Sequence, residues 1–389
     1  MNKFFQLNKE FESTNDIVKF TNDFKDQLNA TRFMLIRSLD AKSIKKILEN
    51  KNINYKNKKL FELMNVLFET DVSVECLVTF IKGEKQKLIE ERKNELSNLD
   101  SLLKCIPIVQ AGIRDDKVDG VIQQFVRNKN IKSFDEFENE LNSIILPRIK
   151  NYAYWSYYNQ TSNDIIELHF LKHNKVIPTL RKIHDIDFFI EVEDSIIPFD
   201  LKVTHISDSY FDIARQGIVK NNNNKIYDDF VVKNTNKTEI EEIKDFYKSN
   251  KKQYKLPNYG SLKKSEMVNE ISKIDSSQAK NFIAELEKRR SSLIPAGKDL
   301  KKLEWWNYKY QGERLFSNNN RIFIFLAYSN QFKDARELKG DVDEIGKIIK
   351  NLLDNISLDK INRINYYYDK DLNKSGNYTA NSISDIYIK

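Results

Sequence analysis

The first 150 residues carry apolar side chains at three- and four-residue spacing, which is the pattern of amphipathic helices. The clearest segments span residues 17–29, 41–48, 59–68 and 74–98. Ser133 is followed by Glu136 three residues later, the spacing of a capping box at a helix start. The region has no residue spacing typical of a catalytic or metal site. We therefore predict a helical N-terminal domain over residues 1–150 that contacts DNA or a partner, or serves as a scaffold.

From residue 162 onward, helical and strand patterns follow one another. In chain order they predict a helix at 162–171, a strand pair at 187–193 and 196–204, a helix from Ser207 or Asp208 past Gln216, a buried strand at 321–327, a helix at 342–355, and strands at 364–368 and 383–388. A basic and largely helical insertion interrupts this order at about 225–315. The order predicts an α/β domain over residues 151–389, with a mixed β-sheet flanked by helices.

The strand pair 187–204 places charged side chains on one face. Side chains alternate along a strand, so Asp200 and Lys202 share the face opposite Phe199, Leu201 and Val203. If the two strands pair as a hairpin, Asp187 lies beside Asp200. Two carboxylates and an ammonium group then converge on one point, which predicts a functional site.

This set of side chains suits hydrolysis of a phosphodiester. Mg²⁺ binds oxygen ligands and keeps several waters, so the carboxylates of Asp187 and Asp200 and the carbonyl of Leu201 suffice to hold it. Lys202 would lie near the attacking water and offset the negative charge that builds on the phosphate. The cation would polarise the phosphate and activate the water.

The order Glu167, Asp187 and Asp200-Leu201-Lys202 resembles the PD-(D/E)xK nuclease superfamily, which includes many type II restriction endonucleases. The resemblance implies a restriction-endonuclease-like fold, Mg²⁺ or Mn²⁺ as cofactor, and Glu167, Asp187, Asp200 and Lys202 as catalytic residues. Gln216 is similar to a glutamine that some members carry on the following helix. Ile186 stands where the motif has proline, a position at which that proline is frequently absent.

Charge and composition are compatible with this assignment. The 389 residues carry a net charge of +7, which permits binding to DNA phosphates without requiring it. With two cysteines and no apolar run long enough to span a membrane, the sequence favours a cytoplasmic protein. The predicted DNA contacts are Gln216, Lys251, Lys252, Lys255, Asn258, Tyr259, Lys263, Lys264, Arg289 and Arg290.

We therefore expect a Mg²⁺-dependent type II restriction endonuclease that acts in defence against foreign DNA. It would cut double-stranded DNA as a homodimer, beside a cognate DNA methyltransferase. Two alternatives stay open, namely an antiphage effector nuclease activated by a partner, and a non-catalytic nucleic-acid-binding scaffold in which the acidic hairpin is structural. His169 and His173, four residues apart, have the spacing of a zinc pair but lack the H-E-x-x-H pattern.

Overall fold

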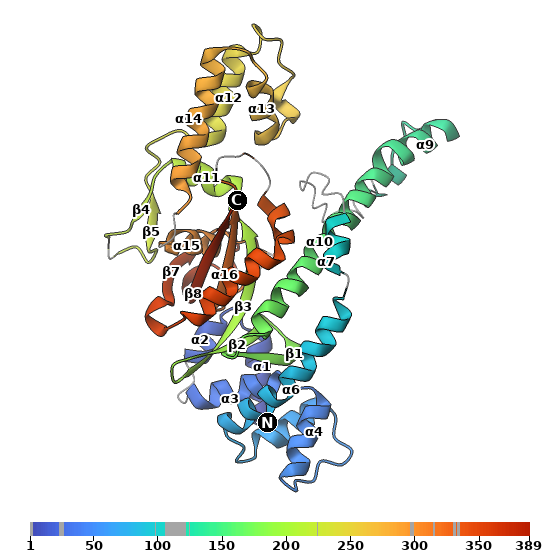
Figure 1. Cartoon of the computed structure of the whole chain (residues 1–389), viewed down its shortest axis with the longest axis vertical. Coiled ribbons are helices and arrows are strands. Elements are labelled where there is room, and N and C mark those ends of the chain that lie inside the picture. The colour runs from blue at the N-terminus through green and yellow to red at the C-terminus, as the bar shows by residue number, and fades with distance from the viewer. Residues whose placement is uncertain are drawn as a thin grey trace.

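The computed structural model describes most of the chain, including all six strands of the central sheet. The described residues are 3–22, 27–97, 99–105, 122–123, 125–223, 225–295, 299–313, 316–329, 332 and 335–389. A central sheet lies between helices of the N-terminal region at one end and a second helical group at the other (Figure 1).

Six strands form the sheet in the order β1-β2-β3-β6-β8-β7. Their bounds are Val176–Ile183 (β1), Ile186–Val192 (β2), Ser195–His205 (β3), Arg321–Ala327 (β6), Asn362–Tyr368 (β7) and Gly376–Ile388 (β8). The β1-β2-β3 part is antiparallel, β6 is parallel to both β3 and β8, and β7 is antiparallel to β8. The sheet is therefore mixed, as the sequence pattern predicts.

Two helices cover one face of the sheet, namely α10 (Leu146–Leu171) and α16 (Val342–Asp354). The apolar residues of β2, β3 and β6 that point to this face share one buried cluster with both helices. All seven residues of β6 are buried, because this central strand is covered on both faces. A continuous apolar run is the sequence pattern of such a strand.

The opposite face is covered in two parts. N-terminal helices pack on β1 and β2, where Ile177, Ile183, Ile186 and Phe189 join their apolar cluster. Helices α11 (Asp208–Arg215) and α15 (Lys301–Lys309) pack on the β6-β8-β7 end of the sheet. The face between these two covers carries the charged side chains of β3.

The N-terminal region is helical, as predicted, and it extends onto the sheet. Its helices are α1 (Lys3–Ser13), α2 (Ile17–Asn22), α3 (Gln27–Arg37), α4 (Ala41–Asn50), α5 (Leu60–Phe68), α6 (Val74–Glu95), α7 (Leu99–Cys105), α9 (Phe134–Glu140) and the π-helical turn η1 (Leu141–Ile145). The η1 turn continues into α10, so α9 and the first half of α10 project from the molecule (Figure 1). None of the described helices combines the length and apolar character that a membrane crossing requires.

The insertion forms a small helical group with its own apolar cluster. It begins with a two-stranded ribbon, β4 (Ile218–Lys220) and β5 (Phe230–Val232), and continues through α12 (Glu239–Asn250), η2 (Tyr259–Ser261), α13 (Lys264–Ser272) and α14 (Ser277–Leu293). Two further 3₁₀ turns, η4 (Ala335–Gly340) and η5 (Leu358–Lys360), flank α16. Helix α15 lies within the range predicted for the insertion, but it packs against the sheet.

Several elements differ from the sequence-based expectations, and three of them border the sheet or the site. Strand β1 was missed because Pro178 and three polar residues break the alternation, which an edge strand tolerates. The helix expected at 162–171 is the last part of α10. That helix starts at Leu146 and has Pro147 in its first turn, where proline is tolerated. The helix expected to run past Gln216 ends at Arg215, with Gly217 in a left-handed conformation (φ 97°) directly after its C-cap.

Candidate active site

A cleft of about 970 Å³ opens on the face that carries Asp200 and Lys202. Its walls come from α6, α10, the β1-β2-β3 strands, the C-terminal turn of α15 and the segment that leads into β6. The four predicted catalytic residues, Glu167, Asp187, Asp200 and Lys202, all line this cleft. Residues separated by up to 35 positions in the sequence thus meet in one place.

The register of the β2-β3 pair brings the two aspartates together. Phe188 of β2 lies opposite Phe199 of β3, so the next position on each strand places Asp187 beside Asp200. Asp187 Oδ2 accepts a hydrogen bond from the backbone N–H of Leu201 at 2.8 Å. Because the N–H and C=O of one strand residue point to the same side, the Leu201 carbonyl also points toward Asp187.

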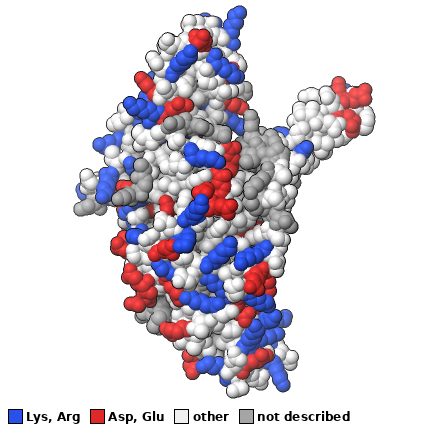
Figure 2. All heavy atoms as spheres, in the orientation of Figure 1, with Lys and Arg blue, Asp and Glu red and all other residues white. Residues whose placement is uncertain are grey.

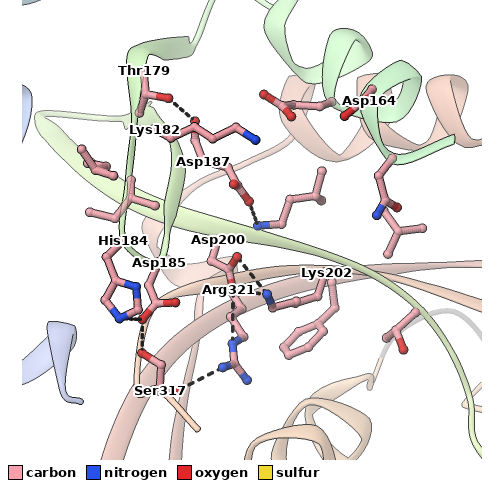
Figure 3. Close-up of a pocket in the computed structure, with 18 of the residues that line it drawn as sticks. Asp164, Thr179, Lys182, His184, Asp185, Asp187, Asp200, Lys202, Ser317 and Arg321 are labelled. Atoms are coloured by element: carbon pink, nitrogen blue, oxygen red, sulfur yellow. Dashed lines mark hydrogen bonds and ion pairs between the residues drawn. The ribbon is translucent and has the colours of Figure 1, made fainter. Parts of the chain in front are cut away.

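Asp200 and Lys202 form the centre of the site (Figure 3). Asp200 is buried, with 6% of its surface exposed, whereas the Lys202 side chain is 45% exposed. Lys202 Nζ donates to Asp200 Oδ1 at 3.0 Å and lies 2.8 Å from Oδ2. The Nε atom of the buried Arg321 lies 3.6 Å from Asp200 Oδ2. Two cations therefore offset the charge of Asp200.

Asp187 has a different electrostatic environment. Burial, followed by the neighbouring charge of Asp200, raises the pKa of Asp187 to about 7, against the opposing effect of the Leu201 N–H. Burial also raises the pKa of Glu167, although Arg92 and Lys182 act in the opposite direction. The side of the cleft between α10 and β2 thus holds two carboxyl groups whose pKa values are raised by burial.

The residues present fit a divalent cation. Asp200 Oδ2 is buried and accepts no hydrogen bond in the structure, although Lys202 lies at ion-pair distance. A buried carboxylate next to a second one, whose pKa is raised by burial and by that neighbour, is a donor set that a hard cation stabilises. Among the described residues, no three His, Cys, Asp or Glu side chains are grouped as a ready metal cluster. Mg²⁺ does not need one, since one or two carboxylates hold it together with water.

Sequence reasoning missed the segment 317–321, which supports the site. Arg321 is 5% exposed and is held by Asn319 Oδ1, Gln311 Oε1 and the Ser317 carbonyl. The Ser317 hydroxyl donates to Asp185 in the β1-β2 turn, where Asp185 has a φ of 57°. The segment therefore connects the turn before Asp187 to the strand beside Asp200. The run Asn318-Asn319-Asn320-Arg321 before a buried strand was the available signal.

Three of the predicted DNA contacts lie in ion pairs, either within the insertion or between it and α11. Lys264 Nζ is 2.8 Å from Asp212 Oδ1 and 2.9 Å from Glu239 Oε2. Arg290 is buried and pairs with Asp208, with its Nη1 atom 3.5 Å from Glu239. Arg289 lies 3.3 Å from Glu242. Lys264 and Arg290 are therefore buried in ion pairs, as structural cations are, and a DNA contact by either residue stays a prediction.

The other predicted DNA contacts lie at the insertion surface or near it, away from the cleft. Lys252, Lys255, Asn258 and Lys263 are exposed, and Lys251 is half-buried. Tyr259 packs edge-on against Tyr247 at 5.9 Å, as part of the insertion's apolar cluster. Gln216 caps α11 and is not among the described residues that line the cleft. Figure 2 shows acidic and basic groups intermixed over the visible face, including its α12–α14 end.

The two histidines with zinc-pair spacing face α16 instead of a shared site. A side chain on Gly346 of α16 would collide with the His169 ring, and His173 Nε2 lies 3.1 Å from Asp354 Oδ1. Burial lowers the pKa of His169. Both histidines therefore pack between the C-terminal end of α10 and helix α16.

Comparison with known protein families, with curated protein sequences and with solved structures finds no match to this chain.

Proposed function

We propose that the protein is a Mg²⁺-dependent endonuclease that hydrolyses phosphodiester bonds of DNA, on a fold of the restriction-endonuclease type. One observation carries the proposal: Asp187 and Asp200 lie side by side in an open cleft, with Lys202 2.8 Å from Asp200, and Glu167 of α10 lines the same cleft. The raised pKa of Asp187 supports it, because crowded, buried carboxylates are typical of functional sites.

Each residue has a distinct part in this chemistry. Asp187 and Asp200, with the carbonyl of Leu201, would hold the cation, which when bound polarises the phosphate and activates water. Lys202, half-exposed and with three N–H donors, orients the attacking water and stabilises negative charge that develops on the phosphate. Glu167 supplies a further acceptor for ordered water in the cleft. Arg321, on the neighbouring strand β6, holds Asp200 in position through an ion pair.

The biological role we propose is restriction of foreign DNA by a type II enzyme. In that role the protein acts as a homodimer on double-stranded DNA and has a cognate methyltransferase. Two features favour this role over a nuclease driven by an NTP-hydrolysing motor. All four proposed catalytic residues come from one chain and line one cleft, and the sequence has no P-loop.

The test is cleavage of plasmid and phage DNA with Mg²⁺, with Mn²⁺, and in EDTA. The substitutions Asp200→Asn and Lys202→Met keep the size of the side chains and remove their charges. We expect discrete metal-dependent products from the native protein and a loss of rate of about 100-fold or more in both variants. Asp194→Asn, an exposed acid at the tip of the same hairpin, is the matched control and should cut normally.

The outcomes separate the competing functions. Activity that needs phage infection or an added partner would favour an antiphage effector, with the same active site. Absence of cleavage with either metal, together with DNA binding that both variants retain, would overturn the nuclease proposal in favour of a non-catalytic binding protein.

A further inference from the structure

Helix α6 of the N-terminal region is fixed to the sheet next to the cleft. Lys85 is buried and donates to the carbonyls of His173 and Val176, the latter at 2.6 Å, where α10 gives way to β1. Lys82, one turn earlier, pairs with Glu191 of β2 at 2.5 Å. Three contacts from two lysines of α6 therefore set its position relative to the catalytic strands.

The same face of α6 reaches the cleft further along the helix. Leu88 and Arg92 follow Lys85 at helical spacing, and both line the cleft. Arg92 is half-exposed, and the acid near it is the exposed Glu95 at 3.6 Å, one turn away on the same helix. An exposed pair of this kind contributes little, so the guanidinium can exchange it for a stronger anion.

A second cation reaches the cleft from the edge strand β1. Arg181 donates to the Arg37 carbonyl of the N-terminal helices at 3.2 Å. The next residue, Lys182, lines the cleft, and in Figure 3 it extends over Asp187 toward the α10 helix that carries Asp164. It is exposed, and no carboxylate of the described residues lies within ion-pair distance of it.

Arg92 and Lys182 flank Glu167 from two different elements. Both cations act on the Glu167 carboxyl, so both lie within electrostatic reach of it. The acidic groups on this side of the cleft, Asp164, Glu167 and Asp187, would repel a nucleic-acid backbone when ionised. A strand can pass this wall only where cations offset that repulsion.

We propose that Arg92 and Lys182 form a phosphate grip, which holds a backbone phosphate beside the one that is cut. Helix α6 thereby brings the N-terminal region into direct contact with the substrate strand. The grip rests on the proposed function only in taking DNA as its ligand, because it acts through binding and not through the chemical step.

The experiment measures DNA binding and its salt dependence. A fluorescein-labelled 30-base-pair duplex is titrated with the full-length protein in EDTA at several NaCl concentrations, and binding is followed by anisotropy. We expect Arg92→Gln and Lys182→Gln each to weaken binding about three- to tenfold and to reduce the slope of log Kd against log salt by about 0.9. Arg92→Lys keeps the charge and should keep most of the slope.

Lys87→Gln is the matched control on the same helix. Lys87 is 60% exposed, pairs with Glu91 and does not line the cleft, so its loss should leave the slope unchanged. Thermal unfolding of every variant confirms that the fold is intact, as the exposure of both grip side chains predicts.

The two hypotheses fail in different ways. Metal-dependent cleavage with unchanged salt slopes in Arg92→Gln and Lys182→Gln would overturn the grip and leave the nuclease. Reduced slopes in these two variants, without cleavage in any metal, would support the grip and overturn the nuclease. A native protein that neither binds the duplex at low salt nor cleaves DNA with either metal would overturn both.

Discussion

At the scale of single residues, the two aspartates of the cleft are unequal although they lie side by side. Asp200 has Lys202 and Arg321 at ion-pair distance, whereas Asp187 accepts a backbone hydrogen bond and faces the charge of Asp200. Burial raises the energy of a charge that has no counter-charge. Asp187 is therefore the group whose ionisation a bound cation would control.

This inequality predicts a pH dependence of stability in the protein without metal. Since the pKa of Asp187 is raised to about 7 in the folded state, from about 3.9 in an unfolded chain, the folded state holds a proton that the unfolded state has lost between these values. The contribution of Asp187 to the free energy of unfolding is largest below about pH 4 and decreases as the pH rises to about 7. Above that pH it does not change further. Asp187→Asn removes the effect.

Thermal unfolding in EDTA from pH 4 to pH 9 measures this difference. We expect the Tm of Asp187→Asn to increase relative to that of the native protein as the pH rises. At pH 8 the variant should have the higher Tm, by about 2 °C or more. Asp194→Asn is the control for loss of an exposed acid. A difference in Tm that is constant across the pH range would contradict the environment described for Asp187.

At the scale of elements, the insertion is joined to the sheet domain by buried charges. Lys264 begins α13 and lies between Asp212 of α11 and Glu239 of α12, and Arg290 of α14 approaches the same Glu239. Helices α11, α12, α13 and α14 thus all contribute to one cluster of charges. Such a cluster orients the helices, because a wrong arrangement would leave a buried charge alone.

The substitution Lys264→Met therefore tests the assignment of this lysine as a structural cation. It leaves Glu239 buried with Arg290 as the remaining cation at 3.5 Å, so we expect a loss of about 3 kcal/mol in the free energy of unfolding. Urea denaturation measures the loss. DNA affinity per folded molecule should stay unchanged.

Lys273→Met is the control, because Lys273 forms an exposed pair with Glu270 at the end of the same helix. We expect this change to stay within about 0.5 kcal/mol. If Lys264→Met were as mild as the control and weakened DNA binding instead, the lysine would be a DNA contact after all.

At the scale of the whole molecule, the N-terminal helices and the sheet share apolar clusters. Leu88 and Ile89 of α6 join the cluster under α10, and the β1-β2 residues Ile177 and Phe189 join the cluster of the N-terminal helices. A boundary near residue 150 therefore separates two sequence patterns but cuts through shared cores.

A fragment of residues 146–389 tests how far the sheet depends on these helices. Without them it would expose the apolar side of β1 and β2, and we expect it to aggregate or to lack cooperative unfolding. The full chain in the same buffer is the control. A soluble fragment with a sharp unfolding transition would show that the sheet domain folds without the N-terminal region.

Much of the architecture could be predicted from local patterns, since these depend on each residue's immediate neighbours. The helical periodicity of the first 100 residues, the apolar run 321–327 and the alternation in 196–204 all correspond to elements in the structure. Strand β1 could not be predicted, because an edge strand accepts proline and charge. The burial of Lys264 and Arg290 could not be predicted either, because their partners come from other helices.

For the candidate site, the shared face of Asp200 and Lys202 follows from the residue pattern alone, because alternation is a property of the strand. The groups that surround them depend on how the chain folds. The parallel pairing of β3 with β6 brought Arg321 to Asp200, and the fixing of α6 by Lys82 and Lys85 brought Arg92 to Glu167. Contacts between distant segments depend on how the elements pack together, and the residue pattern within one element does not specify that packing.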